Sequence, residues 1–433
     1  MLLRTDTAAP ISARSVDLRG LQRRILRVLV GAEILAALGG SGAAAGALLA
    51  LDIIGNESLA SLPLALLVVG SSATVVPISA LSRRAGRRTG LTVSLAIAAF
   101  GAAGTIAAGV LESFALLCAA SVVFGAGNTA VMLARYAAAD LSLATERGRA
   151  IGRVVFAATL GGVAGPNLLA PAGAVATALG LPELTGLYLF AAAAFALAGL
   201  VLFVFLRPDP LTVATTLEQE AAPEVEPREP LVPLRRLLAP VAAVAGLATV
   251  VTANFVMVAT MAMAPVHMQG QGHSLGVVGF VVSLHIAGMF APSPVTGWLT
   301  DRFGPLPVAT AGAGLLLVAG VMAAASGHHT GRFAFGLFLL GVGWNAGLIA
   351  GSTLLASAVP VAQRPRVEGV GELSMGVAAG SATAIAGPVV GLAGYATLAI
   401  AAAVAAAALG PFLLAVARWG LPTQTARANR LLS

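Results

Sequence analysis

The sequence is poor in charged residues, has a single cysteine, Cys118, and contains no lysine, because all 25 of its basic residues are arginines. Only 10% of its 433 residues are charged, whereas 58% are hydrophobic. Such a chain cannot bury its apolar side chains in the core of a soluble protein. One cysteine also excludes an intrachain disulfide framework and a metal site built from thiolates alone. The composition therefore predicts an integral membrane protein.

Apolar runs rich in glycine and alanine fill most of the chain. They are long enough for membrane helices of about 20 residues, and too continuous for the alternating strands of a membrane barrel. Small residues also suit close packing between membrane helices. We therefore predict an all-α membrane protein with twelve transmembrane helices, at residues 25–51, 58–81, 89–111, 113–134, 150–179, 183–206, 237–264, 275–299, 306–326, 332–356, 368–392 and 394–417.

The only long polar insert lies between the sixth and seventh predicted helices, at residues 207–236. Its acidic, proline-rich TLEQEAAPEVEPREP core predicts a disordered linker. The insert separates an N-terminal six-helix bundle, 1–206, from a C-terminal six-helix bundle, 237–433. A shift of 218 residues places LSRRAGRR (Leu81–Arg88) over LTDRFGPL (Leu299–Leu306). This internal repeat predicts two pseudo-symmetric bundles of common origin.

The arginines are concentrated in the two tails, the central insert and alternate loops, whereas the loops between these carry mostly acidic residues. The pattern predicts one of the basic loops from Arg135 to Arg153. Because positively charged loops remain in the cytoplasm, we predict that both termini and the insert are cytoplasmic. Topology and contact with the lipid bilayer then explain the formal net charge of +7, with no need for nucleic acid.

Methionine and histidine gather in the seventh and eighth predicted helices. Met257 and Met261 are four residues apart in the first of these, and His285 and Met289 are four apart in the second. Residues with this spacing share one face of a helix, so the two helices can present three thioethers and one imidazole to one ion. Thioether sulfur favours soft Cu(I), and no carboxylate cluster favours a harder ion. The pattern predicts a copper site made of these four residues.

Ordinary packing is the alternative interpretation, because methionine in a membrane helix usually fills space. Five of the nine methionines lie in this short stretch, however, and a histidine within a span is costly without a task or a partner. We therefore favour the ligand interpretation. Close to the loop between the two helices, Met263, His267, Met268 and His273 are candidates for metal entry, with an ordinary polar loop as the alternative.

Other polar residues within the spans are few. Glu33 is a lone carboxyl in the first predicted helix and should face the bundle interior or a water path. It is either a proton-coupling site or a hydrogen-bonded structural residue. Asn128, Asn254 and Asn345 either line a cavity or bridge helices, and we favour bridging.

The loop GWLTDRFG (Gly297–Gly304) resembles the signature turn of the major facilitator superfamily, which occurs at the equivalent place in both halves of its members. The resemblance extends over nearly the whole chain. It implies two six-helix bundles and a gating role for Gly297, Asp301, Arg302 and Gly304.

In the first half, the equivalent loop contains Arg83, Arg84 and Gly86, and Arg83 stands at the acidic position of the signature. Ser121 stands where many proton-driven members have an arginine in the fourth span.

A GGVAGP run partly resembles the Gly-Pro motif of drug antiporters. It makes Gly161, Gly165 and Pro166 a candidate hinge, or simply a bent and tightly packed part of a helix.

The paired patterns Met257-Val-Ala-Thr-Met261 and His285-Ile-Ala-Gly-Met289 are similar to the signature of the CcoA-like copper importers within this superfamily. This resemblance implies a monomer in the bacterial cytoplasmic membrane that imports copper by alternating access for cytochrome oxidase assembly. Copper would be the substrate, handed to cytoplasmic copper chaperones, and no bound cofactor is expected.

Neither a nucleotide-binding loop nor a catalytic constellation is recognisable, so we do not expect an enzyme. Two alternatives remain open: efflux of a hydrophobic drug or metabolite by the same fold, and a non-transporting copper sensor or assembly factor.

Overall fold

The computed structural model describes residues 18–40, 42–55, 59, 62–221 and 233–419. These residues are almost entirely helical, so most of their backbone N–H and C=O groups are hydrogen-bonded within their own helix, as lipid demands. The helices of the first bundle are α1 (Leu18–Gly40), α2 (Ala43–Ile54), α3 (Leu62–Val110), α4 (Phe114–Phe124), α5 (Ala126–Asp140), α6 (Arg147–Asn167), α7 (Leu169–Ala178) and α8 (Gly186–Phe205).

The second bundle begins after the linker helices α9 (Pro210–Ala221) and α10 (Leu234–Leu237). Its helices are α11 (Val241–Ala262), α12 (Ala264–Gly270), α13 (Leu275–Phe290), α14 (Ser293–Phe303), α15 (Pro305–Ala324), α16 (Thr330–Ala358) and α17 (Arg364–Trp419).

Two of the helices turn back sharply at a glycine. Gly86 in α3 has φ 87° and Gly394 in α17 has φ 78°, a conformation that favours glycine. Each of these helices therefore crosses the membrane twice. Gly304, between α14 and α15, adopts φ 89° and ψ 159°, close to the φ 87° and ψ 165° of Gly86. The two halves of the repeat thus share one backbone turn.

Eight helical stretches among the described residues are long and apolar enough to span a membrane. With α3 and α17 each counted as two crossings, and with the pairs α1–α2 and α6–α7, the described residues form the twelve expected segments. The prediction of an all-α membrane protein is confirmed. Breaks within single crossings, such as that between α4 and α5, lie inside apolar runs and were not expected.

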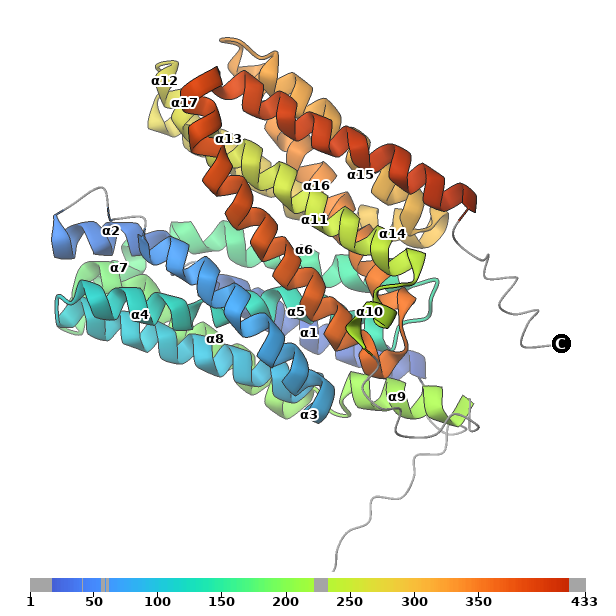
Figure 1. Ribbon diagram of the computed structural model, residues 1–433. Helices are drawn as coiled ribbons and strands as arrows, with labels where there is room; N and C mark the ends of the chain where they lie inside the picture. Colours follow the sequence, from blue (N-terminus) through green and yellow to red (C-terminus); the bar gives the residue numbers. More distant parts are fainter. Residues whose placement is uncertain (1–17, 41, 56–58, 60–61, 222–232, 420–433) are drawn as a thin grey trace, which may run out of the picture.

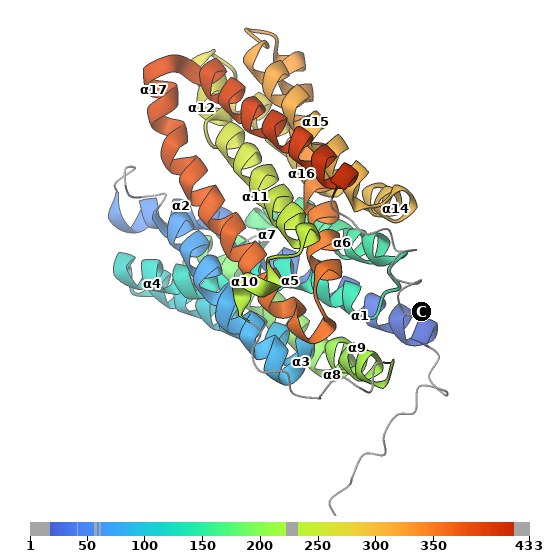
Figure 2. The ribbon, with the colours of Figure 1, turned by 45° about the vertical axis from the view of Figure 1, so that its right-hand side comes forward.

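The two bundles lie at an angle to one another (Figure 1). They meet where α3 packs against α17 and α6 packs against α14. The ends that carry α2 and α12 lie apart, and α9 and α10 lie at the opposite end, where the bundles approach (Figure 2). We call this second end the arginine-rich end, because Arg83 and Arg84 line a cavity with α9 there and Arg366 lines one with Leu234 of α10.

The central insert is ordered in part, which corrects the prediction of a disordered linker at residues 207–236. Helix α9 occupies Pro210–Ala221 and buries Leu211 and Ala214 against Val361. Asp209 caps this helix by accepting hydrogen bonds from the backbone N–H of Leu211, at 3.0 Å, and of Thr212. Composition alone does not reveal these few apolar contacts, because the segment as a whole is acidic and rich in proline. The acidic remainder, 222–232, and both tails lie outside the described residues.

Candidate functional site

A cavity of about 260 Å³ lies between the bundles and is lined by helices of both. We call it the central cavity. The first bundle contributes α3 and α5, and the second contributes α11, α13, α16 and α17. Its lining combines hydroxyl, amide and carboxyl groups with two aromatic rings and three thioethers: Ser71, Ser72, Asn128, Thr129, Asn254, Glu372, Phe290, Trp344, Met132, Met289 and Met375.

Hydrogen bonds already hold several of these polar groups in place. The Asn128 amide donates to the Ser71 hydroxyl at 2.9 Å, while the Asn128 side chain remains exposed to the cavity. On the opposite wall, Asn254 accepts from the Trp344 indole at 3.1 Å and donates to the Met375 carbonyl at 2.8 Å. Asn254 therefore both lines the cavity and bridges α11, α16 and α17. Asn128 is the polar group best placed to meet a ligand.

A buried ion pair joins the bundles beside the central cavity. The Arg135 guanidinium contacts the Glu372 carboxylate and donates to the Ser352 hydroxyl at 3.0 Å. Tyr136 also donates to Glu372, at 3.3 Å. Arg135 was expected in a loop, and that prediction is wrong, because α5 continues to Asp140 and carries Arg135 into the protein interior.

A second charged network closes the arginine-rich end between α3, α5 and α17. Arg87 donates to Asp140 at 2.8 Å and to Glu368 at 2.6 Å, and all three side chains are buried. Arg364 completes the network at 3.6 Å from Asp140. Buried charges are tolerated only when paired, so this network defines the closed arrangement of the bundles.

Arg147, at the start of α6, extends this contact surface by donating to the Ser357 hydroxyl at 2.9 Å. Burial and the nearby Arg364 guanidinium lower the pKa of Arg147 to about 10.

The loop with the family signature contacts the N-terminus of α6. The Asp301 carboxylate accepts hydrogen bonds from the backbone N–H of Gly148, at 2.7 Å, and of Arg149, at 2.9 Å. A helix N-terminus is a favourable place for a carboxylate. Gly297 lies so close to α6 that a Cβ added to it would be 2.9 Å from the Gly148 carbonyl carbon. Of the other predicted gating residues in this half, Arg302 is exposed, and Gly304 forms the turn already described.

The equivalent loop of the first half makes a different contact. The backbone N–H of Arg88 donates to the Asp209 carboxylate at 2.7 Å, so the linker supplies an acid close to Gly86. Arg83 and Arg84 instead line a cavity of about 480 Å³ shared with α9. The two signature loops are thus alike in backbone and different in partners.

Among the four predicted copper ligands, Met289 lines the central cavity. His285 is 2% exposed, and its Nδ1 donates to the Leu337 carbonyl at 2.8 Å. Its Nε2 atom is buried and has no hydrogen-bond partner among the described residues. Met257 and Met261 are partly buried on α11 and pack against the apolar core of the second bundle. The cavity lining therefore includes one of the four, and convergence on one ion stays a prediction.

The segment that was expected to be a metal-collecting loop is largely the short helix α12, which corrects that expectation. Met263 caps α11 and is partly buried, and Met268 is buried in the core of the second bundle. His267 stacks on Tyr395 with ring centroids 4.4 Å apart. His273 is hydrogen-bonded to the Thr330 hydroxyl at 3.2 Å. A role in metal entry stays a prediction.

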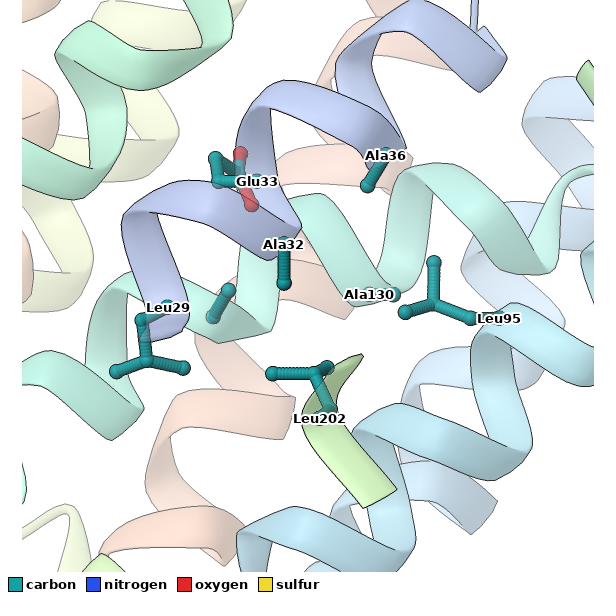
Figure 3. A pocket seen from close by; sticks show the side chains of 8 residues that line it. Leu29, Ala32, Glu33, Ala36, Leu95, Ala130 and Leu202 are labelled. Carbon is teal, nitrogen blue, oxygen red and sulfur yellow. The ribbon is translucent and has the colours of Figure 1, made fainter. Parts of the chain in front are cut away.

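Glu33 lies in α1 and is buried inside the first bundle. The sequence predicts this position, because a carboxyl group exposed to lipid is energetically costly. Its side chain lines a void of about 10 Å³ together with Leu95, Ala130 and Leu202 (Figure 3). That volume suits about one water molecule. The Arg135 guanidinium is near enough to act on Glu33 electrostatically.

The candidate hinge coincides with an interruption of the fifth membrane crossing. Gly161 and Gly165 lie in α6, which ends at Asn167, and α7 begins at Leu169. The single helix expected at 150–179 is therefore two helices that meet just after Pro166. Bending at this point stays a prediction.

Two six-helix bundles that enclose a central cavity and meet at one end are the architecture of a secondary transporter. This chain belongs to the Major Facilitator Superfamily, whose family model matches residues 29–327 and 245–431. It is a multi-pass membrane protein of a family of transporters.

Known relatives agree with this assignment. The chain is 37% identical to the uncharacterized MFS-type transporter YddS of Bacillus subtilis, over 91% of each chain. It is 28% identical to the riboflavin transporter RfnT of Brucella anthropi, over 82% of this chain and 85% of that protein. The solved structure of the transporter FucP in its outward conformation superposes with a TM-score of 0.66, 16% identity and coverage of 90% and 97% of the two chains. This last likeness concerns the fold alone.

Proposed function

We propose that this protein is a monomeric secondary transporter of the bacterial cytoplasmic membrane that carries a small organic solute by alternating access. The central cavity supports this proposal best, because both bundles line it and a rocking motion between them would change its exposure. The arginine-rich end would face the cytoplasm, with both chain ends on that side. In this arrangement the bundles are closed toward the cytoplasm.

The cavity favours a planar ring that carries hydroxyl or amide groups. Trp344 and Phe290 lie edge to face with ring centroids 5.9 Å apart, and their rings offer apolar contact area. Ser71 and Asn128 on the opposite wall offer hydrogen bonds. Pockets for organic ligands combine such apolar walls with a few fixed polar groups. Riboflavin has this chemistry, and one relative is named a riboflavin transporter. We therefore propose a flavin-like solute.

Reconstituted protein tests the substrate directly. Riboflavin is fluorescent, so its uptake into proteoliposomes with an imposed proton gradient can be followed and compared with protein-free liposomes. We expect saturable uptake that is absent from protein-free liposomes. Uptake no faster than in protein-free liposomes, together with no binding to the purified protein, would reject the flavin-like solute.

Proton coupling is proposed through Glu33. In the observed arrangement, Arg135 is paired with Glu372 and Ser352 of the second bundle. Separation of the bundles at this end removes both partners, and an unpaired buried guanidinium is costly. Glu33 is a buried carboxyl of the first bundle, and Arg135 acts on it electrostatically. Loss of its proton would supply the missing negative charge, so opening toward the cytoplasm is coupled to proton release from Glu33.

Copper import is the second candidate, favoured by the unpartnered Nε2 of His285 and by Met289 at the central cavity. Copper would then be the substrate, held by Met257, Met261, His285 and Met289, and passed to cytoplasmic chaperones for cytochrome oxidase assembly. Uptake of radioactive copper by the wild type, Met261→Ala and His285→Ala variants tests this candidate. Equal copper accumulation in all three would reject this site. Riboflavin uptake without copper uptake would favour the organic solute.

A further inference from the structure

A further cavity, of about 510 Å³, lies within the first bundle at the arginine-rich end, between the start of α1 and the start of α6. The beginning of α1 lies at the same end of the molecule as α9 (Figure 2). Four arginines line it, Arg19, Arg23, Arg149 and Arg153, with Glu146 as its acidic residue. We call it the arginine cavity.

Three of these arginines have side chains with no partner among the residues that the structure describes. The described residues provide no hydrogen bond or ion pair to the side chains of Arg19, Arg23 and Arg153, and all three are exposed. Glu146 forms no ion pair with them among the described residues. Arg149 differs, because its Nε lies 3.6 Å from the Asp301 carboxylate. Guanidinium groups that line one cavity without carboxylate partners are a typical site for a phosphate.

The same cavity contains a buried amide whose oxygen accepts no hydrogen bond from the described residues. Gln22 is 9% exposed, and its Nε2 donates to the Ala138 carbonyl at 2.8 Å and to the Ser142 hydroxyl at 2.7 Å. Its Oε1 accepts no hydrogen bond within the described structure. Burial of an acceptor without a hydrogen bond is costly, so we expect a ligand to donate a hydrogen bond to Gln22 Oε1. A hydroxyl next to the phosphate would supply it.

Apolar groups distinguish a lipid from free phosphate. Leu18, which is 40% exposed, and Leu143, which is 53% exposed, line the cavity beside the arginines. The arginines of α1 end at Arg27, and the apolar stretch that follows begins at Val28. The cavity therefore lies at the level where the helix enters the hydrocarbon region, and its leucines can contact the glycerol backbone of a lipid. Free phosphate would leave them in water.

We propose that the arginine cavity binds the headgroup of an anionic glycerophospholipid that carries a hydroxyl as well as a phosphate, as phosphatidylglycerol does. Arg19, Arg23 and Arg153 bind the phosphate, and Gln22 Oε1 accepts a hydrogen bond from the headgroup hydroxyl. Arg149 adds positive charge to the site while its backbone holds Asp301.

Native mass spectrometry of the full-length protein in detergent tests this site. Phosphatidylglycerol is titrated against phosphatidylcholine, which has no net charge, and against phosphatidylmethanol, which has the same charge but no hydroxyl. We expect the wild type to bind phosphatidylglycerol at least tenfold more tightly than phosphatidylcholine. The R19Q/R23Q/R153Q variant should lose this preference, whereas R235Q/R236Q/R418Q, which removes three exposed arginines elsewhere, should keep it. Arg149 is left intact because it contacts Asp301.

The hydroxyl is tested separately. The wild type should prefer phosphatidylglycerol to phosphatidylmethanol by about fivefold, and Gln22→Ala should remove that preference. If the triple variant does not fold, Arg19→Gln and Arg23→Gln are measured singly, each with an expected loss of about fivefold. Arginine variants that bind phosphatidylglycerol as the wild type does would overturn the proposal. If inorganic phosphate displaced the lipid at equal concentration, the ligand of the cavity would be phosphate and not a lipid.

Discussion

Arg87 in α3 and Glu368 in α17 lie 281 residues apart in the sequence and are joined by a hydrogen-bonded ion pair of 2.6 Å. Asp140 binds the same guanidinium at 2.8 Å, so Arg87 is shared between its own bundle and the other. The pair closes the arginine-rich end, and its two partners must separate when that end opens. It therefore links the stability of the closed arrangement to the transport cycle.

Glu368→Gln should shift the protein toward arrangements that are open at the arginine-rich end. Loss of one partner from a buried ion pair costs about 3–5 kcal/mol, although Asp140 still compensates Arg87 in part. In a Cys118→Ser background, a cysteine at the buried Ser79, which faces Gly369 across the bundles, reports on opening. We expect maleimide labelling at least tenfold faster than in the parent. Glu112→Gln, at an exposed carboxyl, is the control, and equal labelling of both variants would contradict this role.

Gly297→Ala should prevent closure between α6 and α14. The added Cβ would lie 2.9 Å from the Gly148 carbonyl carbon and 3.0 Å from the Arg149 Cα, and backbone atoms cannot move aside within a packed helix. Because this contact lies between bundles, each bundle should still fold. We expect solute uptake to fall at least tenfold. Gly314→Ala is a matched control in α15, where an added Cβ meets nothing within 4 Å. Normal uptake by Gly297→Ala would show that close approach here is unnecessary.

Glu33→Gln should uncouple transport from the proton gradient. The amide preserves the shape of the buried side chain but cannot release a proton, so it cannot compensate Arg135 when Glu372 withdraws. We expect loss of concentrative uptake with exchange of solute across the membrane retained. The pH dependence of the wild-type rate should also disappear. Glu112→Gln, at an exposed carboxyl, should behave as the wild type. Concentrative uptake by Glu33→Gln would assign the coupling proton to another group.

Asn128→Ala should weaken solute binding without unfolding the protein. Its amide faces the central cavity and bonds the Ser71 hydroxyl at 2.9 Å, so its loss removes one or two hydrogen bonds to the ligand. Each such bond contributes about 1 kcal/mol, which predicts an increase in the dissociation constant for riboflavin of about five- to thirtyfold. Fluorescence titration measures it, with Thr383→Ala at an exposed site of α17 as the control. An unchanged dissociation constant would place the solute elsewhere.

Much of the fold can be predicted from the sequence. Lipid leaves the backbone no other hydrogen-bond partner, so long apolar runs must be helices, and the twelve crossings follow from hydropathy. The turn at Gly86 and its repeat at Gly304 follow from the need for a positive φ between two crossings. Helix boundaries were less predictable: α1 begins at Leu18, before its apolar part, because hydropathy marks only the segment that lies in lipid.

The contacts between helices were decided by the tertiary structure alone. A spacing of four residues places His285 and Met289 on one face of a helix, but packing directs His285 toward Leu337 and Met289 into the central cavity. Arg135 looks like a loop residue in the sequence and becomes a buried partner of Glu372. The spacing of residues along the sequence shows which side chains share a face of one helix. It does not show ion pairs such as Arg135–Glu372, which join helices that are distant in the chain. The sequence alone determined a twelve-helix membrane protein, and the packing of the helices against each other determined its site.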